Sequence, residues 1–350
     1  MTYRVIQWTT GNVGAPALRA IIEHPEMELV GVYSHAEEKL GKDAAVLCGL
    51  EGKTGVLATN DVDTLIALKA DCVNYNTLVP SVDELERLLE SGVNVVGTAA
   101  FIIGRCLGEG AEERLEAACQ RGKSSLYGTG INPGTSNVLA LVASGLCDRI
   151  HSVSVTESVD VTDYASRETW EGMGWAKPPG SAGQQEASEW RTRELRDAME
   201  MTAEGLGIEI DDVKFELEYA VTSEAIVLPY MTYPACTVAG QRTTYHGMVK
   251  GRSVVRQHIV YRVRGPLEPE FPLVHGYLAE IEGEPGIRVE TRLMKPSVPG
   301  INRETNYMGS GMVATAMPAV NAIPAVCAAE PGVRRAYELP PITARGLLFP

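Results

Sequence analysis

The residues best suited to chemistry lie at the start of the chain, in a small-residue turn that follows an apolar stretch at 5–8. Gly11 and Gly14 occupy the second and third positions of a dinucleotide-binding fingerprint, and Thr9 occupies the first. Such a turn directs unpaired backbone N–H groups and the positive end of a helix dipole at one point, which suits a pyrophosphate. We expect these dinucleotide contacts: Thr9, Thr10, Gly11, Asn12, Val13 and Gly14. A strand-turn-helix start that binds no nucleotide is the alternative.

The end of the second predicted strand, near residue 34, indicates which dinucleotide binds. Folds specific for NAD place an Asp or Glu about twenty residues after the glycines, where it holds the ribose hydroxyls and repels a 2′-phosphate. Here that place carries Ser34 and His35, with Lys39 close by, and we expect these side chains to contact the 2′-phosphate of NADP. Glu37 and Glu38 lie beside them. The alternative is therefore that these are ordinary loop residues and that the cofactor is NAD.

Polar loops follow the later strands predicted at 72–76 and 94–98. Open α/β sheets bind ligands beyond the carboxyl ends of their strands, so these loops should lie beside the cofactor. A glycine-rich turn at 128–134 follows a further strand and should face the same crevice, act as a hinge between domains, or do both. The cofactor contacts expected in these loops are Asn76, Thr77, Thr98, Ala99, Asn132 and Pro133.

The order of predicted elements sets the fold class. Strands alternate with helices over about the first 130 residues, which predicts an α/β domain with a Rossmann-type doubly wound parallel sheet. From residue 150 the pattern changes to a period of two, at 150–160, 215–221, 241–250 and 253–263. This pattern predicts a second, α+β domain with a mostly antiparallel sheet.

The composition is that of an ordinary globular protein, with 45% hydrophobic and 22% charged residues among 350. The net charge of −14 disfavours nucleic acid and anionic membranes as partners. Seven cysteines without C-x-x-C spacing predict reduced thiols in the cytoplasm and no metal site. The uncharged stretch 311–329 is long enough to span a membrane, but Asn321, Pro318 and Pro324 interrupt it, so we interpret it as buried core.

Three segments together carry a family likeness: 5–14, 130–134 and 320–324. In them the chain resembles the dihydrodipicolinate-reductase-like superfamily, and within it the branch of 2,4-diaminopentanoate dehydrogenases and related NAD(P)H-dependent amine dehydrogenases. The His-His and Lys-x-x-x-Ser-Gly-Thr patterns of true dihydrodipicolinate reductases are missing from the sequence. That particular reaction is therefore not expected.

The resemblance implies a domain organisation. A Rossmann domain is expected at 1–135, and a substrate-binding and dimerisation domain with an open sheet at 136–304. The segment 305–350 is expected to return to the first domain, with Asn321 beside the cofactor. The resemblance also implies a homodimer.

The reaction implied by this branch is the reversible condensation of a carbonyl compound with ammonia, followed by hydride transfer to the imine carbon. A carboxylate must activate ammonia and move protons, preferably with a pKa raised by an apolar pocket. In the loop after Thr98 the first acid is Glu109, which we expect to be that carboxylate. A solvated charge on a helix face is its alternative role. Other candidates lie at the entry to the second domain: Glu157, Asp160 and Asp163.

Apolar and aromatic side chains in the loops, together with one histidine on a predicted strand, are expected to form the substrate pocket. They are Phe101, Ile102, Trp170, Met173, Trp175 and His246. The alternative role of the aromatic residues is core packing. The alternative role of the histidine is a structural one. No cluster of Arg or Lys marks a carboxylate-binding pocket, which favours substrates without an α-carboxylate.

Together these expectations describe a cytoplasmic, NADP-dependent oxidoreductase of the amine dehydrogenase kind. It would join a small, largely apolar ketone or aldehyde to ammonia, or run the reverse deamination. One alternative is an NADPH-dependent carbonyl or imine reductase. Another is a non-catalytic NADPH-binding sensor, which threonine at the first fingerprint position would permit.

Overall fold

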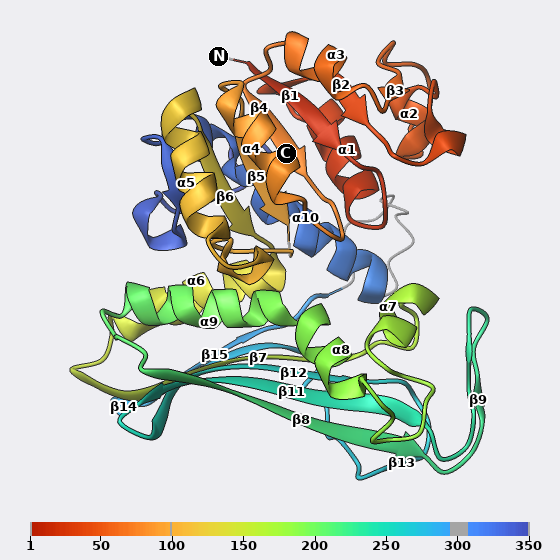
Figure 1. Cartoon of the computed structure of the whole chain (residues 1–350), viewed down its shortest axis with the longest axis vertical. Helices are drawn as coiled ribbons and strands as arrows, with labels where there is room; N and C mark the ends of the chain where they lie inside the picture. Colours follow the sequence, from red (N-terminus) through yellow and green to blue (C-terminus); the bar gives the residue numbers. More distant parts are fainter. Residues whose placement is uncertain (1, 99, 295–306, 349–350) are drawn as a thin grey trace. The chain divides into compact units, whose positions relative to one another are not determined.

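The computed structural model describes residues 2–98, 100–294 and 307–348, and the chain divides into two compact units (Figure 1). Unit 1 comprises Met1–Thr135 and Gly311–Pro350, and unit 2 comprises Ser136–Ser310. Ala99, one of the expected cofactor contacts, lies outside the described residues.

Unit 1 is built on a parallel sheet of seven strands in the order β16-β6-β5-β4-β1-β2-β3. The strands are β1 (Tyr3–Trp8), β2 (Met27–Tyr33), β3 (Ala58–Thr59), β4 (Cys72–Tyr75), β5 (Asn94–Thr98), β6 (Ser125–Thr129) and β16 (Gly332–Arg334). The direction of winding reverses between β1 and β4, the point where such sheets bind ligands. The predicted doubly wound parallel sheet is confirmed.

Helices cover both faces of this sheet. Successive side chains of a strand point to opposite faces, so both faces carry apolar side chains that the helices bury. Ile6 and Trp8 share a core with α3 (Val62–Ala67), α4 (Val82–Glu90) and α5 (Ala111–Gly122). Val5 faces the other way, onto α1 (Gly14–Glu23) and α10 (Tyr307–Cys327). Shorter elements of the unit are η1 (Glu37–Lys39), α2 (Ala44–Leu47), η2 (Arg105–Leu107), η3 (Ile131–Thr135) and η4 (Ala336–Glu338).

α10 contains most of the uncharged stretch that the sequence analysis singled out. Ala316, Val320 and Ile323 are fully buried in the core that it shares with the sheet. By length and composition Gly309–Cys327 could cross a membrane, and 39% of its most apolar window is buried inside the protein. Core helices of soluble proteins have the same length and composition, and the packing of α10 on the sheet agrees with that role.

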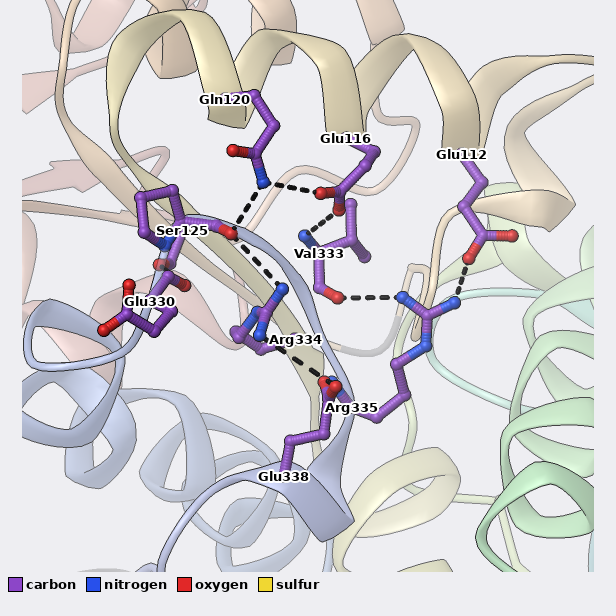
Figure 2. A network of polar contacts seen from close by, with 10 residues as sticks. Glu112, Glu116, Gln120, Ser125, Glu330, Val333, Arg334, Arg335 and Glu338 are labelled. Carbon is purple, nitrogen blue, oxygen red and sulfur yellow. Dashed lines mark hydrogen bonds and ion pairs between the residues drawn. The ribbon is translucent and has the colours of Figure 1, made fainter. Parts of the chain in front are cut away.

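The C-terminal segment is fixed to α5 by a network of polar contacts (Figure 2). Glu116 accepts a hydrogen bond from the backbone N–H of Val333 at 2.7 Å. Gln120 donates to Glu116 at 2.9 Å, and Glu112 forms an ion pair with Arg335. These contacts hold β16 in register at the edge of the sheet.

Glu116→Ala is expected to lower the free energy of unfolding by about 1–3 kcal/mol, because the Val333 N–H loses its acceptor. Urea denaturation would measure the loss. Glu113→Ala in the same helix removes an exposed carboxylate and serves as the matched control. Equal losses in the two variants would contradict an anchoring role for Glu116.

Unit 2 is built on a second seven-stranded sheet in the order β13-β8-β11-β12-β7-β14-β15. The strands are β7 (Arg149–Asp160), β8 (Asp212–Thr222), β11 (Val238–Val249), β12 (Arg252–Arg262), β13 (Leu267–Glu268), β14 (Gly276–Glu284) and β15 (Ile287–Thr291). Neighbours pair antiparallel except β7 and β12, which pair parallel. A separate pair joins β9 (Ile226–Val227) and β10 (Thr232–Tyr233). The predicted mostly antiparallel second sheet is confirmed.

The two faces of this sheet differ. The face that bears Tyr245 and Ile259, here called the helix face, lies against α6 (Ser136–Ser144), α7 (Arg167–Gly172), α8 (Gln184–Arg191) and α9 (Arg193–Gly205) (Figure 1). The opposite face, here called the open face, bears Thr244, His246 and His258. Within the described residues no helix covers the open face (Figure 1).

Candidate functional site

The carboxyl ends of β1, β4 and β5 are joined by a network of buried polar side chains. Gln7 Nε2 donates to Asn76 Oδ1 at 2.6 Å and to the carbonyl oxygen of Thr9 at 2.8 Å. Asn74 Nδ2 donates to Gln7 Oε1 at 2.8 Å, and Asn76 Nδ2 donates to Thr98 Oγ1 at 2.6 Å. This network fixes the strand ends on which the expected cofactor contacts lie. Gln7 and Asn74 were not expected, although amides inside apolar strands are a usable signal.

The turn after β1 has the conformation that its glycine pattern indicates. A Cβ on Gly14 would lie 2.4 Å from the carbonyl oxygen of Thr9, so only glycine lets α1 approach the strand this closely. No atom lies within 4 Å of the position that a Cβ on Gly11 would take, so a ligand can approach the backbone there. Thr9 has a φ of +66° and its hydroxyl donates to the carbonyl oxygen of Asn76 at 2.9 Å. That bond helps threonine to occupy a conformation in which glycine is the usual residue.

The loop after β2 is brought to this turn. Lys39 Nζ donates to the carbonyl oxygen of Thr10 at 2.9 Å, which places a positive charge beside the turn. Ser34 is buried, and its Oγ accepts from the backbone N–H of Ala36 at 3.2 Å. His35 is exposed. The structure therefore places Lys39 against the turn and exposes the His35 side chain.

Five buried side-chain polar atoms of unit 1 have no hydrogen-bond partner among the described residues. Two are Asn74 Oδ1 and Arg334 Nε, and the other three belong to expected cofactor contacts: Thr10 Oγ1 in the turn, Thr77 Oγ1 after β4 and Asn321 Oδ1 on α10. Buried polar groups are normally paired, so an orphan of this kind points to a ligand or water. With the open approach at Gly11, these last three atoms fit a polar cofactor bound at the carboxyl edge of the sheet.

An aromatic stack lies beneath the same strand ends. Trp8 stacks on Tyr33 with ring centroids 4.1 Å apart, and on Tyr75 at 6.1 Å. Glu84 on α4 accepts hydrogen bonds from the Trp8 indole at 3.1 Å and from the Tyr75 hydroxyl at 2.6 Å. Burial, and then the Glu84 carboxylate, raises the pKa of Tyr75, which stays protonated. These contacts fix the Trp8 ring at the end of β1, next to the turn.

The loop after β5 turns its apolar side chains into unit 1. Phe101 and Ile102 are almost completely buried. The Phe101 ring lies 2.7 Å from the place that a Cβ on Gly97 would take, and a Cβ on Gly128 would lie 2.4 Å from the Phe101 carbonyl oxygen. The core of unit 1 therefore uses the Phe101 side chain, one of the two that were expected here to line a substrate pocket.

Glu109 stands at the other end of this loop, between Gly108 and Gly110, and is exposed. The described part of unit 1 therefore gives its carboxylate no apolar surroundings. The neighbouring Glu112 is fixed instead, because Arg105 Nε donates to it at 2.5 Å. In the turn after β6, Asn132 and Pro133 are buried.

The expected pocket residues of unit 2 separate into two places. Trp170, Met173 and Trp175 are buried in the core of the helix face, where the two indole rings lie 4.9 Å apart. His246 lies on the open face, with Nδ1 2.9 Å from Ser253 Oγ and Nε2 3.2 Å from Glu216. The structure does not bring His246 together with the tryptophans, because alternate residues of β11 point to opposite faces.

The acids at the entry to unit 2 also separate. Arg264 forms ion pairs with Asp160 at 3.1 Å and Asp163 at 2.8 Å. Glu157 is 9% exposed on the helix face and accepts a hydrogen bond from the Tyr261 hydroxyl. Of these three carboxylates, Glu157 is the most buried.

Glu194, in the first turn of α9, is a carboxylate that sequence reasoning missed. It keeps part of its surface exposed, yet burial of the carboxyl group raises its pKa to about 8. Nearby Asp197 acts in the same direction, and Arg193 and Arg191 act in the opposite one. A glutamate within a helical pattern gives no signal that distinguishes it from a solvated surface charge.

The matches to protein families agree with the division of the chain near residue 135. The 2,4-diaminopentanoate dehydrogenase C-terminal domain matches residues 136–346. The N-terminal part of dihydrodipicolinate reductase matches residues 5–121. The first of these matches covers more than half of the chain.

Full-length relatives are similar in sequence or in fold. An amine dehydrogenase of Streptomyces virginiae is 27% identical over 98% of both chains. A 2,4-diaminopentanoate dehydrogenase of Acetoanaerobium sticklandii is 23% identical over 96% of this chain and 93% of its own. The solved structure of an amine dehydrogenase from Mycobacterium smegmatis has the same fold, with a TM-score of 0.78, 20% identity and coverage of 99% of this chain and 98% of that one. The chain belongs to the 2,4-diaminopentanoate dehydrogenase C-terminal domain family and is an amine-dehydrogenase-like, NAD(P)-dependent oxidoreductase.

Proposed function

We propose that this protein is a cytoplasmic NADP-dependent amine dehydrogenase that joins a small, largely apolar ketone or aldehyde to ammonia, and runs the reverse deamination. The observation that carries the proposal is the full-length similarity to an amine dehydrogenase. The absence of a His-His pattern in the sequence disfavours the dihydrodipicolinate reductase reaction.

The turn after β1 would bind the pyrophosphate of the cofactor through its backbone N–H groups. The other proposed contacts along the carboxyl edge are Asn76, Thr77, Thr98, Asn132, Pro133 and Asn321. Ala99, which lies outside the described residues, is a further proposed contact. When bound, the cofactor supplies the hydride that reduces the imine carbon. The role of this chain is to hold the nicotinamide and the imine in line and to move protons.

The preference for NADP rests on the loop after β2. Ser34, His35 and Lys39 are the proposed contacts of the 2′-phosphate, and the end of β2 carries no acid that would repel it. The bond from Lys39 to Thr10 supports the proposal, because it holds the ammonium group at the turn.

Lys39→Met is expected to weaken NADPH binding about tenfold and to weaken NADH binding less, because only NADPH carries a 2′-phosphate for this charge to bind. Isothermal titration calorimetry with both cofactors would measure the change. Lys42→Met, a second lysine of the same loop region, is the control for net charge. Equal losses for NADPH and NADH would assign Lys39 a purely structural role.

Glu109 is our proposed proton-transfer carboxylate, because it is the first acid after β5. Its exposure in unit 1 weakens that proposal. Glu157 is the second candidate, since it is buried and hydrogen-bonded to Tyr261. A carboxylate in either place would take a proton from ammonium and return one to the departing hydroxyl.

The test is NADPH oxidation over a panel of short ketones and aldehydes, each with and without concentrated ammonium. Turnover that requires ammonium is the expected result. Equal rates without ammonium would make the protein a carbonyl reductase. NADPH binding without turnover would favour the sensor alternative, to which the exposure of Glu109 lends some support.

We also propose a homodimer, as the resemblance to this superfamily implies. Light scattering after gel filtration should give twice the chain mass of 37.7 kDa. A monomer at micromolar concentration would remove the proposal.

A further inference from the structure

Two cysteines that are far apart in the sequence lie together in unit 1. Cys72 is the first residue of β4 and is completely buried in the core that α10 shares with the sheet. Cys327 is the last residue of α10 and packs against the same core, with part of its surface exposed. Both thiols are free. The pair therefore marks the place where the last turn of α10 meets the sheet.

The contacts of the two thiols place them beside each other. Cys327 Sγ donates to the carbonyl oxygen of Asp71, the residue directly before Cys72, at 3.6 Å. Cys72 Sγ donates to the carbonyl oxygen of Val73 at 3.6 Å. Burial, and then the adjacent Cys327 thiol, raises the pKa of Cys72 well above its ordinary value. The Cys327 side chain is thus a direct neighbour of the Cys72 side chain.

Two other thiols of unit 1 have a different environment. Burial also raises the pKa of Cys48 and of Cys119. The side chains that act on Cys48 are Arg19 and Glu23, and Glu116 acts on Cys119. Charged groups therefore accompany these two thiols, whereas a second thiol lies beside Cys72.

We propose that Cys72 and Cys327 form a site of reversible oxidation, at which hydrogen peroxide converts the two thiols into a disulfide that ties α10 to β4. The partly exposed Cys327 thiolate attacks the peroxide, so that an S–O bond forms, the O–O bond breaks and hydroxide leaves. The Cys72 thiolate then attacks the Cys327 sulfur, so that the S–S bond forms and the S–O bond breaks. The two thiols lose two electrons and two protons, and the peroxide is reduced to two molecules of water.

The pair lies at the edge of the sheet opposite the proposed cofactor site. Cys72 begins β4, whereas Asn76 and Thr77 follow the end of the same strand at the carboxyl edge. A disulfide at Cys72 would hold the end of α10 on the sheet without entering that site. The inference therefore goes beyond the proposed function and does not depend on it.

Oxidation should make the protein more stable. A disulfide between these residues closes a loop that contains most of the chain, and cross-links over long loops restrict the unfolded chain most. The melting temperature of the oxidised protein should therefore exceed that of the reduced protein by at least about 5 °C. Dithiothreitol should reverse the increase, because it reduces the disulfide.

The test is treatment of the full chain with hydrogen peroxide, followed by alkylation of the remaining thiols, digestion without reductant and mass spectrometry. The expected product is a pair of peptides joined through Cys72 and Cys327. Cys327→Ser should give neither the joined peptides nor the higher melting temperature. Cys236→Ser, which removes an exposed thiol of unit 2, is the matched control and should give both.

Two results would overturn the proposal. The first is that Cys72 and Cys327 stay unlinked in the native protein at a peroxide concentration that oxidises the exposed Cys236. The second is an equal rise in melting temperature in the native protein and in Cys327→Ser. Should Cys327→Ser fail to fold, Cys327→Ala and the joined peptides of Cys236→Ser decide in its place.

Discussion

Gly14→Ala is expected to abolish cofactor binding, with a dissociation constant for NADPH raised at least a hundredfold, or about 2.7 kcal/mol. The added methyl group would lie 2.4 Å from the carbonyl oxygen of Thr9, which is backbone and cannot rotate away. α1 must therefore separate from β1, which displaces the N–H groups of the turn and lowers stability as well. Calorimetric titration with NADPH and thermal melting would measure the two effects.

Gly11→Ala separates the two effects. No atom lies within 4 Å of the position of its methyl group, so this variant should melt as the native protein does. The methyl group would nevertheless stand where the pyrophosphate must approach, and NADPH should bind more weakly. Native affinity in Gly14→Ala would place the cofactor elsewhere, and native affinity in Gly11→Ala would move the pyrophosphate away from this side of the turn.

Glu109→Gln is expected to lower ammonium-dependent kcat about a hundredfold or more, the usual effect of removing a general acid or base. NADPH affinity should stay within a few-fold, because the glycine turn is untouched. Steady-state rates over the ketone panel would measure kcat, and Glu113→Gln, an exposed acid of the next helix, is the control. Unchanged kcat would remove Glu109 from the mechanism.

Glu157→Gln should behave differently in the same assay. If Glu157 takes no part in proton transfer, its loss leaves kcat close to native. A fall in kcat with native KM would instead transfer the proton-transfer role from Glu109 to Glu157. The split between kcat and KM thus assigns the two carboxylates in one experiment.

Much of the fold can be predicted, because the strands of unit 1 are short apolar runs followed by turn residues and helical patterns. β7, β8, β11 and β12 each alternate in polarity over most of their length, which a period of two detects. β14 escapes that search, because its first four residues, Gly276 to Ala279, are all buried. A strand buried on both faces has no polar side to alternate with.

The site is less predictable than the fold. The turn at Gly11 and Gly14 has a local signature: the carbonyl oxygen of Thr9 leaves no room for a side chain at Gly14, and Gly11 leaves the backbone open to a ligand. Phe101 and Trp170 have none, because an aromatic residue in a loop looks the same whether it lines a pocket or fills a core. For Glu157 the decisive facts are Tyr261 on the next strand and burial under helices, which arise only from tertiary packing.

The aromatic stack of Trp8, Tyr33 and Tyr75 gives unit 1 a tryptophan fluorescence of its own. Trp8 is the single tryptophan in that unit, whereas Trp170, Trp175 and Trp190 belong to unit 2. Its ring lies 4.1 Å from Tyr33, and Trp8 directly precedes the turn that is proposed to hold the dinucleotide. A reduced nicotinamide absorbs where indole emits, so Trp8 fluorescence should be quenched by energy transfer when the dinucleotide binds. The chain thus carries its own emission probe of cofactor occupancy, one that Trp8→Phe would silence while the three indoles of unit 2 continue to emit.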